Sequence, residues 1–247
     1  MPISPNQGSS AGGTIVTITG VNLAGATAVK FGTKTASITA NTPTSVTVVS
    51  PSGSGAVGVT VTTNGGISNP LNFFYIGPPF KSSISDTSGP TAGGNTVAIN
   101  GTGLSTATSV AFGGNNATPT VISDGQISVT VPAGSGAGTV GVSVTTAGGT
   151  NNGLSYTYAD APTITSLTPT SGSDSGGTSV TITGTDLATT EGVTFDGNPA
   201  SYAVINSTTV AAVTPAGTVG AVDVVVTTAG GSATAAGGYT YVAEPGI

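Results

Sequence analysis

The sequence contains no cysteine, no histidine and no tryptophan, and its only cations are three lysines. Without cysteine there is no disulfide and no thiolate nucleophile, and without histidine the usual proton shuttle and transition-metal ligand are missing. We therefore expect no enzyme, no cofactor and no metal site. Only 5% of the 247 residues are charged, against about a quarter in ordinary soluble domains.

The remaining charge is acidic, with nine carboxylates against three lysines and a net charge of −6. Three lysines cannot neutralise a run of phosphates, so nucleic acid is not an expected partner. No stretch approaches 18 apolar residues, so no membrane span is expected. The first ten residues, MPISPNQGSS, lack the basic and apolar regions of a secretory signal. The sequence therefore leaves the export route unknown.

What the chain does contain is a threefold repeat with a spacing of 81 to 83 residues. Each repeat opens on the phrase GGTIVTITG, GGNTVAING or GGTSVTITG and closes on two aromatic residues. A phenylalanine, a proline and a second Gly-Gly pair recur in between. The recurring positions are Phe31, Phe112 and Phe195; Pro51, Pro132 and Pro215; Gly65, Gly148 and Gly230; and the closing aromatics Phe73 and Tyr75, Tyr156 and Tyr158, Tyr239 and Tyr241.

Within each repeat the apolar residues alternate with threonine and serine, which predicts half-buried β-strands. Val59 and Val61 should face inward, and Ile18 should do so together with either Ile15 or Val16. Six or seven short strands in about 82 residues, divided by Gly, Pro and Asn turns, predict a two-sheet sandwich. We therefore expect an all-β chain of three tandem immunoglobulin-like β-sandwich domains, over residues 1–77, 78–160 and 161–247.

The third repeat carries the motif P-x-x-G-x-x-x-G-G-T-x-V-T-I-x-G, which begins at Pro169 and ends at Gly184. A later V-x-F-G runs from Val29 to Gly32 and recurs in the second repeat. Together these motifs resemble the IPT/TIG family of immunoglobulin-like domains, although Asp86 replaces the motif proline in the second repeat. Three such repeats are similar to bacterial surface repeat proteins, which implies an extracellular, cell-surface or virion location. The resemblance implies the fold but selects no function.

Two groups of side chains are candidates for a small-ligand site. Phe74, Phe80 and Tyr202 lie outside the repeated positions and could form an aromatic sugar platform, although a surface or interdomain contact is the favoured interpretation. Four of the carboxylates in the third repeat could serve glycoside hydrolysis or calcium binding, but no spacing matches a known loop. We interpret these as solvated turn residues: Asp186, Glu191, Asp196 and Asp223.

Charge is distributed unevenly, at +2 over residues 1–77, −2 over residues 78–160 and −6 over residues 161–247. Lys30 and Lys34 of the first repeat could therefore meet the acidic third repeat of another molecule. A covalent bond within a repeat would need both a lysine and an acid, and neither outer repeat has both. Lys81 is expected in the linker. Any assembly should therefore be non-covalent.

The segment that joins successive repeats has a third copy divided between the two ends of the sequence. Tyr158 to Pro169 reads YADAPTITSLTP, and YVAEPGI (241–247) followed by MPISP (1–5) aligns with it without a gap. The first repeat lacks the residues equivalent to Pro162–Ile164 in its opening strand. We therefore predict a homo-oligomer in which the tail of one molecule completes the first domain of the next.

The predicted product is a structural, non-covalent filament with subunits joined head to tail. The alternative function is an adhesin or virion-decoration module that binds a glycan or a protein receptor. The predicted subunit interface comprises Met1, Pro2, Ile3, Tyr241, Val242, Ala243, Glu244, Pro245, Gly246 and Ile247, together with Lys30 and Lys34.

Overall fold

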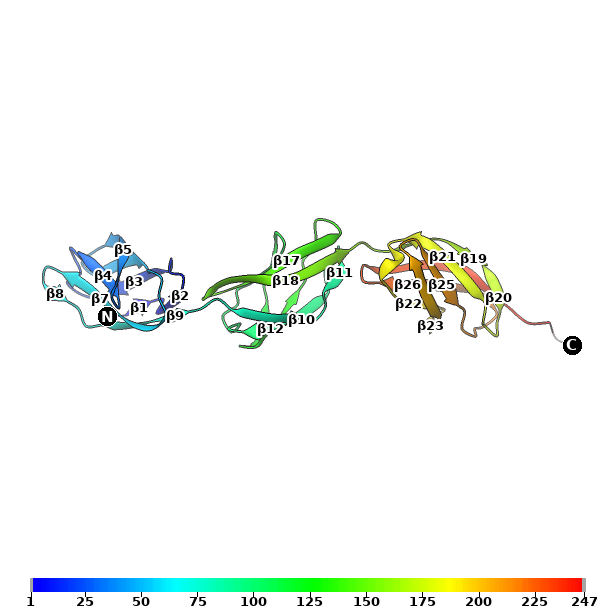
Figure 1. Ribbon diagram of the computed structural model, residues 1–247, viewed down its shortest axis with the longest axis horizontal. Helices are drawn as coiled ribbons and strands as arrows, with labels where there is room; N and C mark the ends of the chain where they lie inside the picture. The colour runs from blue at the N-terminus through cyan, green and yellow to red at the C-terminus, as the bar shows by residue number, and fades with distance from the viewer. Residues whose placement is uncertain (1, 246–247) are drawn as a thin grey trace. The chain divides into compact units, whose positions relative to one another are not determined.

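The computed structural model describes residues 2–245, and each repeat of the sequence forms its own group of strands (Figure 1). Contacts divide the chain into two compact units. The first repeat lies in one unit, the third lies in the other, and residues of the middle repeat occur in both. The only helix among the described residues is a 3-10 turn, η1 (Leu187–Thr189).

The first repeat forms one continuous sheet that folds over its own core. Hydrogen bonds run along the path β1-β3-β6-β5-β4-β7-β9-β2, with β8 on β7. The path is continuous because β5 pairs with β4 through its first three residues and with β6 from Ser37 to Asn41. The strands are β1 (Ile3–Ser4), β2 (Gln7–Ser9), β3 (Ile15–Thr19), β4 (Ala28–Phe31), β5 (Lys34–Asn41), β6 (Ser45–Val49), β7 (Gly55–Thr63), β8 (Gly66–Ile67) and β9 (Leu71–Ile76).

The second repeat has a four-stranded sheet, β10-β12-β16-β15, and a five-stranded sheet, β11-β18-β17-β13-β14. Its strand β11 pairs in parallel with β18, as β2 pairs with β9 in the first repeat. The strands are β10 (Phe80–Ile84), β11 (Ser88–Pro90), β12 (Thr96–Thr102), β13 (Ser109–Phe112), β14 (Asn115–Ala117), β15 (Thr120–Ser123), β16 (Gln126–Thr130), β17 (Gly138–Thr146) and β18 (Gly149–Ala159).

The third repeat repeats this arrangement, with sheets β19-β21-β25-β24 and β20-β27-β26-β22-β23. Its strands are β19 (Thr163–Thr168), β20 (Ser171–Ser173), β21 (Ser179–Thr185), β22 (Thr190–Phe195), β23 (Asn198–Pro199), β24 (Ser201–Asn206), β25 (Thr209–Val213), β26 (Gly220–Thr228) and β27 (Gly231–Val242). The prediction of an all-β chain of immunoglobulin-like sandwiches is confirmed.

The alternating residues are buried as predicted. Val59 and Val61 are buried in β7, and Val16 is buried with Ile18 in β3, whereas Ile15 is 65% exposed. The closing tyrosines anchor each core to the recurring proline. The Tyr75, Tyr158 and Tyr241 hydroxyls donate to the carbonyl oxygens of Pro51, Pro132 and Pro215 at 2.7 to 2.8 Å. All nine repeated aromatic residues are buried, which confirms that they pack in the cores.

Candidate functional site

The second and third repeats each begin with a short extended stretch that lies along their own first sheet. We call residues 77–81 and 160–164 the leader segments. Phe80 and Lys81 pair with β12, and Thr163 and Ile164 pair with β21 in the same register. The side chains alternate, since Pro79 and Lys81 are buried while Phe80 is exposed. In the third repeat Pro162 is likewise buried.

A Gly-Gly turn in each of these two repeats contacts the start of its leader segment. The Cα atoms of Gly148 and Gly230 approach the carbonyl oxygens of Gly77 and Asp160 so closely that an added methyl group would overlap them. The leader of the second repeat is also held by Asn151, whose Nδ2 donates to Pro79 O at 2.6 Å. Glycine is required here by the close approach of another backbone.

The first repeat has the same turn, and within residues 2–245 no segment lies against it as a leader does in the other two repeats. The Gly65 amide donates to Thr63 Oγ1 at 3.2 Å, as Gly148 does to Thr146 and Gly230 does to Thr228. A methyl group on Gly65 would meet only Thr63 Oγ1 among the described atoms, at an ordinary 3.5 Å. The first repeat therefore has the turn already formed, and no residue among 2–245 fills the space beside it.

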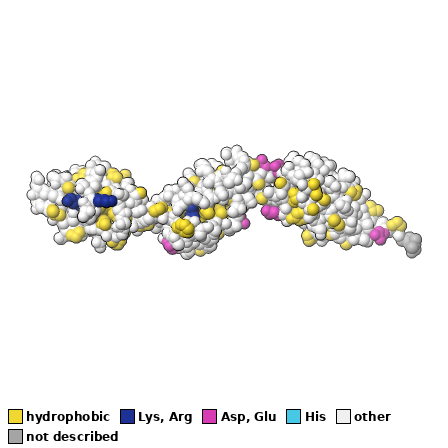
Figure 2. Space-filling view, viewed as in Figure 1, with side chains coloured by type: hydrophobic (Ala, Val, Ile, Leu, Met, Phe, Trp, Pro, Cys, Tyr) yellow, Lys and Arg dark blue, Asp and Glu magenta, His cyan; other side chains and the backbone are white. Residues whose placement is uncertain are grey.

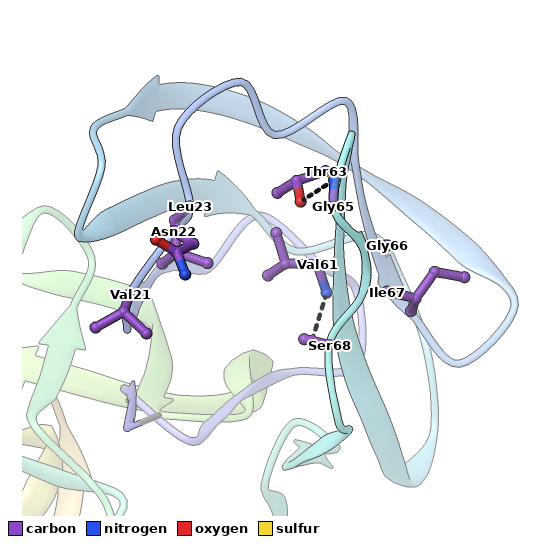
Figure 3. A pocket seen from close by; sticks show the side chains of 9 residues that line it. All are labelled: Val21, Asn22, Leu23, Val61, Thr63, Gly65, Gly66, Ile67 and Ser68. Atoms are coloured by element: carbon purple, nitrogen blue, oxygen red, sulfur yellow. Dashed lines mark hydrogen bonds between the residues drawn. The ribbon is translucent and has the colours of Figure 1, made fainter.

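That space is a groove of about 300 Å³. Figure 3 shows the two segments that face one another across it, residues 21–23 and residues 63–68. Val21 and Ile67 are 76% and 72% exposed. The residues that line it are Val21, Asn22, Leu23, Val61, Thr63, Gly65, Gly66, Ile67 and Ser68.

The edge of β3 beside the groove is covered only in part. Within residues 2–245, β1 pairs with β3 through Ile3 and Ser4, and Pro2 O accepts a hydrogen bond from Thr19 N at 3.0 Å. Val21 occupies the position that Thr102 holds in the second repeat, where Phe80 of the leader pairs with it. The groove of the first repeat is therefore equivalent, by position in the repeat, to the surface that the leader segment covers in the second repeat.

The residue after the closing tyrosine makes the same backbone hydrogen bond in all three repeats. The Asp174 amide donates to Val242 O at 3.0 Å, as Thr91 does to Ala159 and Ser10 does to Ile76. Ser173 Oγ then donates to Glu244 Oε1 at 2.9 Å. Val242 is 51% exposed, and Ala243 to Pro245 are exposed as well.

Some of the predicted interface residues lie beside the groove of the first repeat or in the exposed chain after the third repeat, and others do not. Pro2 and Ile3 lie beside the groove, and Tyr241 to Pro245 form the exposed exit from the third repeat except for the buried ring of Tyr241. Met1, Gly246 and Ile247 lie outside the described residues.

Lys30 and Lys34 do not line the groove. Lys34 lies at the β4–β5 hairpin, and its Nζ donates to Ser52 O at 2.8 Å and to Ser52 Oγ at 3.2 Å. Figure 2 shows charged side chains as isolated spots on a mostly uncharged face.

The expectation that Lys81 lies in the linker is wrong. Lys81 is part of β10 and only 8% exposed. Its Nζ donates to Val142 O at 2.7 Å, and burial lowers the pKa of its amine. The aliphatic stem of lysine can pack like an apolar side chain, which explains why lysine occupies a position that Ile164 holds in the third repeat.

The other candidates do not form a site. Phe74, Phe80 and Tyr202 are 44%, 63% and 38% exposed, and each belongs to a different repeat. The four candidate carboxylates of the third repeat are exposed, and Asp196 occupies a left-handed turn position. Among residues 2–245 no group of three or more His, Cys, Asp or Glu side chains could hold a metal ion. The same residues contain no helix with the length and apolar character needed to cross a membrane.

The groove of the first repeat was not predicted from the sequence. A recurring glycine without a left-handed backbone, such as Gly65, Gly148 or Gly230, is a signal of close backbone approach. The recurrence of proline at Pro79, Pro162 and Pro245 is a second signal.

Three tandem sandwiches, the first folded from one continuous sheet and the others from two sheets each, define a chain of immunoglobulin-like domains. The family model of the IPT/TIG domain matches residues 1–75, 79–158 and 162–241, so the chain belongs to the IPT/TIG domain family. The prediction of the family from the Gly-Gly and V-x-F-G motifs is confirmed.

Among solved structures, the chain is similar to the full extracellular region of plexin A4, with a TM-score of 0.51 and 22% identity. That match covers 89% of this chain and 21% of the plexin chain, so this chain spans about a fifth of its length. It shows the fold.

Two weaker similarities are to the Escherichia coli adhesin FdeC and to a Bacteroides ovatus SGBP-B in complex with a mixed-linkage heptasaccharide. FdeC has a TM-score of 0.32, 14% identity and coverage of 98% and 93% of the two chains. The SGBP-B has a TM-score of 0.32, 16% identity and coverage of 96% and 65%. No function is taken from either similarity.

Proposed function

We propose that this is a structural protein that assembles head to tail into a non-covalent filament. Residues 243–247 of one molecule lie in the groove of the first repeat of the next molecule, as a leader segment. The observation that carries the proposal is the pair of matching surfaces: Pro245 is exposed where Pro79 and Pro162 are buried, and the groove is open where the second and third repeats hold a leader.

The tail fits the groove in sequence as well as in position. Counted from the second residue after the closing tyrosine, the leaders read GPPFK and DAPTI, and the tail reads AEPGI. The third and fifth positions face inward in the two leaders, and the tail has Pro245 and Ile247 there. A strand at the edge of a sheet can contain proline, because one side of its backbone needs no N–H donor.

Covalent linkage favours the binding of each leader segment to its own repeat. A leader belongs to the same chain as its groove and acts at a high effective concentration. Two separate molecules must first lose translational and rotational freedom, at a cost of about 4–15 kcal/mol. We therefore expect assembly to depend on concentration. The contact is heterologous, and a heterologous contact that does not close into a ring generates a filament.

Charge would act on the encounter of two molecules. The first repeat carries +2 through Lys30 and Lys34, whereas residues 161–247 carry −6. Opposite charges steer association and set orientation more than they add affinity, and salt screens them over about 8 Å at physiological ionic strength. We assign the filament to the cell surface, the extracellular space or a virion.

The test is the solution mass of the 247-residue chain over a range of concentrations, with electron microscopy of the same samples. We expect a mass that rises with concentration and unbranched filaments. Removal of Ala243 to Ile247, which leaves β27 intact, should give a monomer at every concentration. Filaments that persist without the tail would contradict the proposal. A monomeric full chain that binds glycans or a receptor protein would favour the alternative adhesin or decoration function.

A further inference from the structure

We infer that the groove of the first repeat is a peptide-binding site that recognises proline. Its ligand class is an extended segment with proline at the third position and a long aliphatic side chain or stem at the fifth. Positions are counted from residues 77, 160 and 243 in the two leaders and the tail. The inference rests on the proposed function for the location of the site, and it adds what the site selects.

The third position is where all three segments agree. The first position is Gly77, Asp160 or Ala243, and the second is Pro78, Ala161 or Glu244. Both positions are exposed in the leaders. In the second and third repeats the residue at the first position makes its contact through the backbone, with its carbonyl oxygen against Gly148 or Gly230. These two positions therefore contribute little to selection by side chain.

The fourth position is also free of selection. It is Phe80, Thr163 or Gly246, and Phe80 is 63% exposed. The fifth position is buried in Lys81 and partly buried in Ile164, which packs against the core of the third repeat. A lysine stem and an isoleucine side chain share length and apolar character, so this position selects both.

In the second repeat Pro79 contacts two residues whose counterparts line the groove of the first repeat. In the second repeat a methyl group on Gly103 would stand 3.5 Å from Pro79 Cα, and Asn151 Nδ2 donates to Pro79 O at 2.6 Å. Gly103 and Asn151 correspond by repeat position to Asn22 and Ser68, which line the groove of the first repeat.

Proline suits this place for two physical reasons. It has no N–H, so it leaves no unpaired donor when its carbonyl is the group that is bonded. Its fixed φ also restricts the free segment, so less conformational entropy is lost when the segment binds. Alanine at this position would lose both the buried ring and the restriction.

The test uses fluorescein-labelled peptides of residues 240–247 and anisotropy, with the chain lacking Ala243 to Ile247 as host so that no tail competes. We expect the peptide with Pro245→Ala to bind about tenfold more weakly, or about 1.4 kcal/mol. Moving the proline by one position, with Glu244→Pro and Pro245→Ala together, should give the same loss. The matched control, Gly246→Ala, should bind as the unmodified peptide does. Unlabelled peptides of residues 76–84 and 159–167 should compete.

Each outcome decides the inference. Equal affinity of the Pro245→Ala peptide, a loss as large for Gly246→Ala, or no binding of the unmodified peptide would overturn it. A host with Gly65→Ala should bind no peptide, and binding there would place the site elsewhere. If the full chain stays monomeric while the peptides show this selectivity, the proposed filament fails and the peptide site stands. If filaments form and Pro245→Ala leaves the affinity of the peptide unchanged, the proposed filament stands and the proposed selectivity for proline fails.

Discussion

The Cα of Gly148 lies against the carbonyl oxygen of Gly77, and no side chain fits between them. Gly230 has the same relationship with Asp160, whereas Gly65 has the same turn and free space beside it. One structural feature therefore occurs in three copies, and within residues 2–245 two of them have a segment packed against them. The proposed assembly follows from that difference.

The first prediction concerns the stability of the joints. Gly148→Ala should destabilise the second repeat by about 1–3 kcal/mol, because overpacking forces the backbone apart. Gly65→Ala should leave the folding stability of the monomer within about 0.5 kcal/mol, as for other surface substitutions. Urea denaturation of both variants at low protein concentration measures the difference. Equal stabilities of the two variants would mean that the contact between Gly148 and the leader segment does not stabilise the second repeat.

A second prediction concerns two equivalent tyrosines. Tyr156 Oη donates to Asn95 Oδ1 at 3.1 Å, whereas Tyr239 Oη is buried and has no hydrogen-bond partner among the described residues. Tyr239→Phe should therefore stabilise the third repeat by about 1 kcal/mol, because an unsatisfied buried hydroxyl is removed. Tyr156→Phe should destabilise the second repeat by a similar amount. Thermal unfolding of the two variants gives the signs, and a loss of stability in Tyr239→Phe would contradict this account.

The third prediction is a loss of stability at alkaline pH. Burial raises the pKa of four tyrosines above the ordinary value of about 10, namely Tyr75, Tyr156, Tyr158 and Tyr241. A raised pKa means that the folded state keeps protons that the unfolded state releases, so this stability is present below pH 10 and is lost as pH rises further.

The lowered pKa of Lys81 acts in the opposite direction, since stability rises with pH between its folded and unfolded values. Because four tyrosines oppose one lysine, the urea concentration at the unfolding midpoint should decrease as the pH is raised from 9 to 11.5. Tyr158→Phe should reduce the slope of that fall. A midpoint that does not change with pH would show that the phenols ionise without unfolding.

The structural features that could be predicted from the sequence are those that local interactions determine. The strands, the inward Val59 and Val61 and the buried aromatic residues follow from alternation and repetition, which act along the chain. The choice between Ile15 and Val16 could not be made locally, because both are apolar and β-branched. The structure selects Val16 through the pairing of β3 with β6.

Lys81 and the groove could not be predicted for a related reason. Lysine is usually exposed, and its burial here depends on a carbonyl oxygen 61 residues away, that of Val142. The groove exists because a segment present in two repeats has no counterpart beside Gly65 within residues 2–245. The sequence around Lys81 carries no signal of its burial, and the groove is signalled only by a comparison of the repeats at Gly65, Gly148 and Gly230.

A fourth prediction is that the first repeat can be closed from within its own chain. Adding the six residues ADAPTI, copied from 159–164, in front of Met1 supplies a leader in the matching register. This variant should stay monomeric, because the added leader fills the groove at a high effective concentration. An extension with the same six residues in scrambled order is the control and should still assemble. Assembly of both variants would show that the groove is not the contact.

The assembly claim is tested most directly by light scattering of the Gly65→Ala variant beside the unmodified chain at equal concentrations. Both carry the same tail and the same charge, and the added methyl group lies where the carbonyl oxygen of residue 243 from another molecule would lie. The account predicts a mass that rises with concentration for the unmodified chain and a constant monomer mass for Gly65→Ala. Equal growth of the two masses would contradict it.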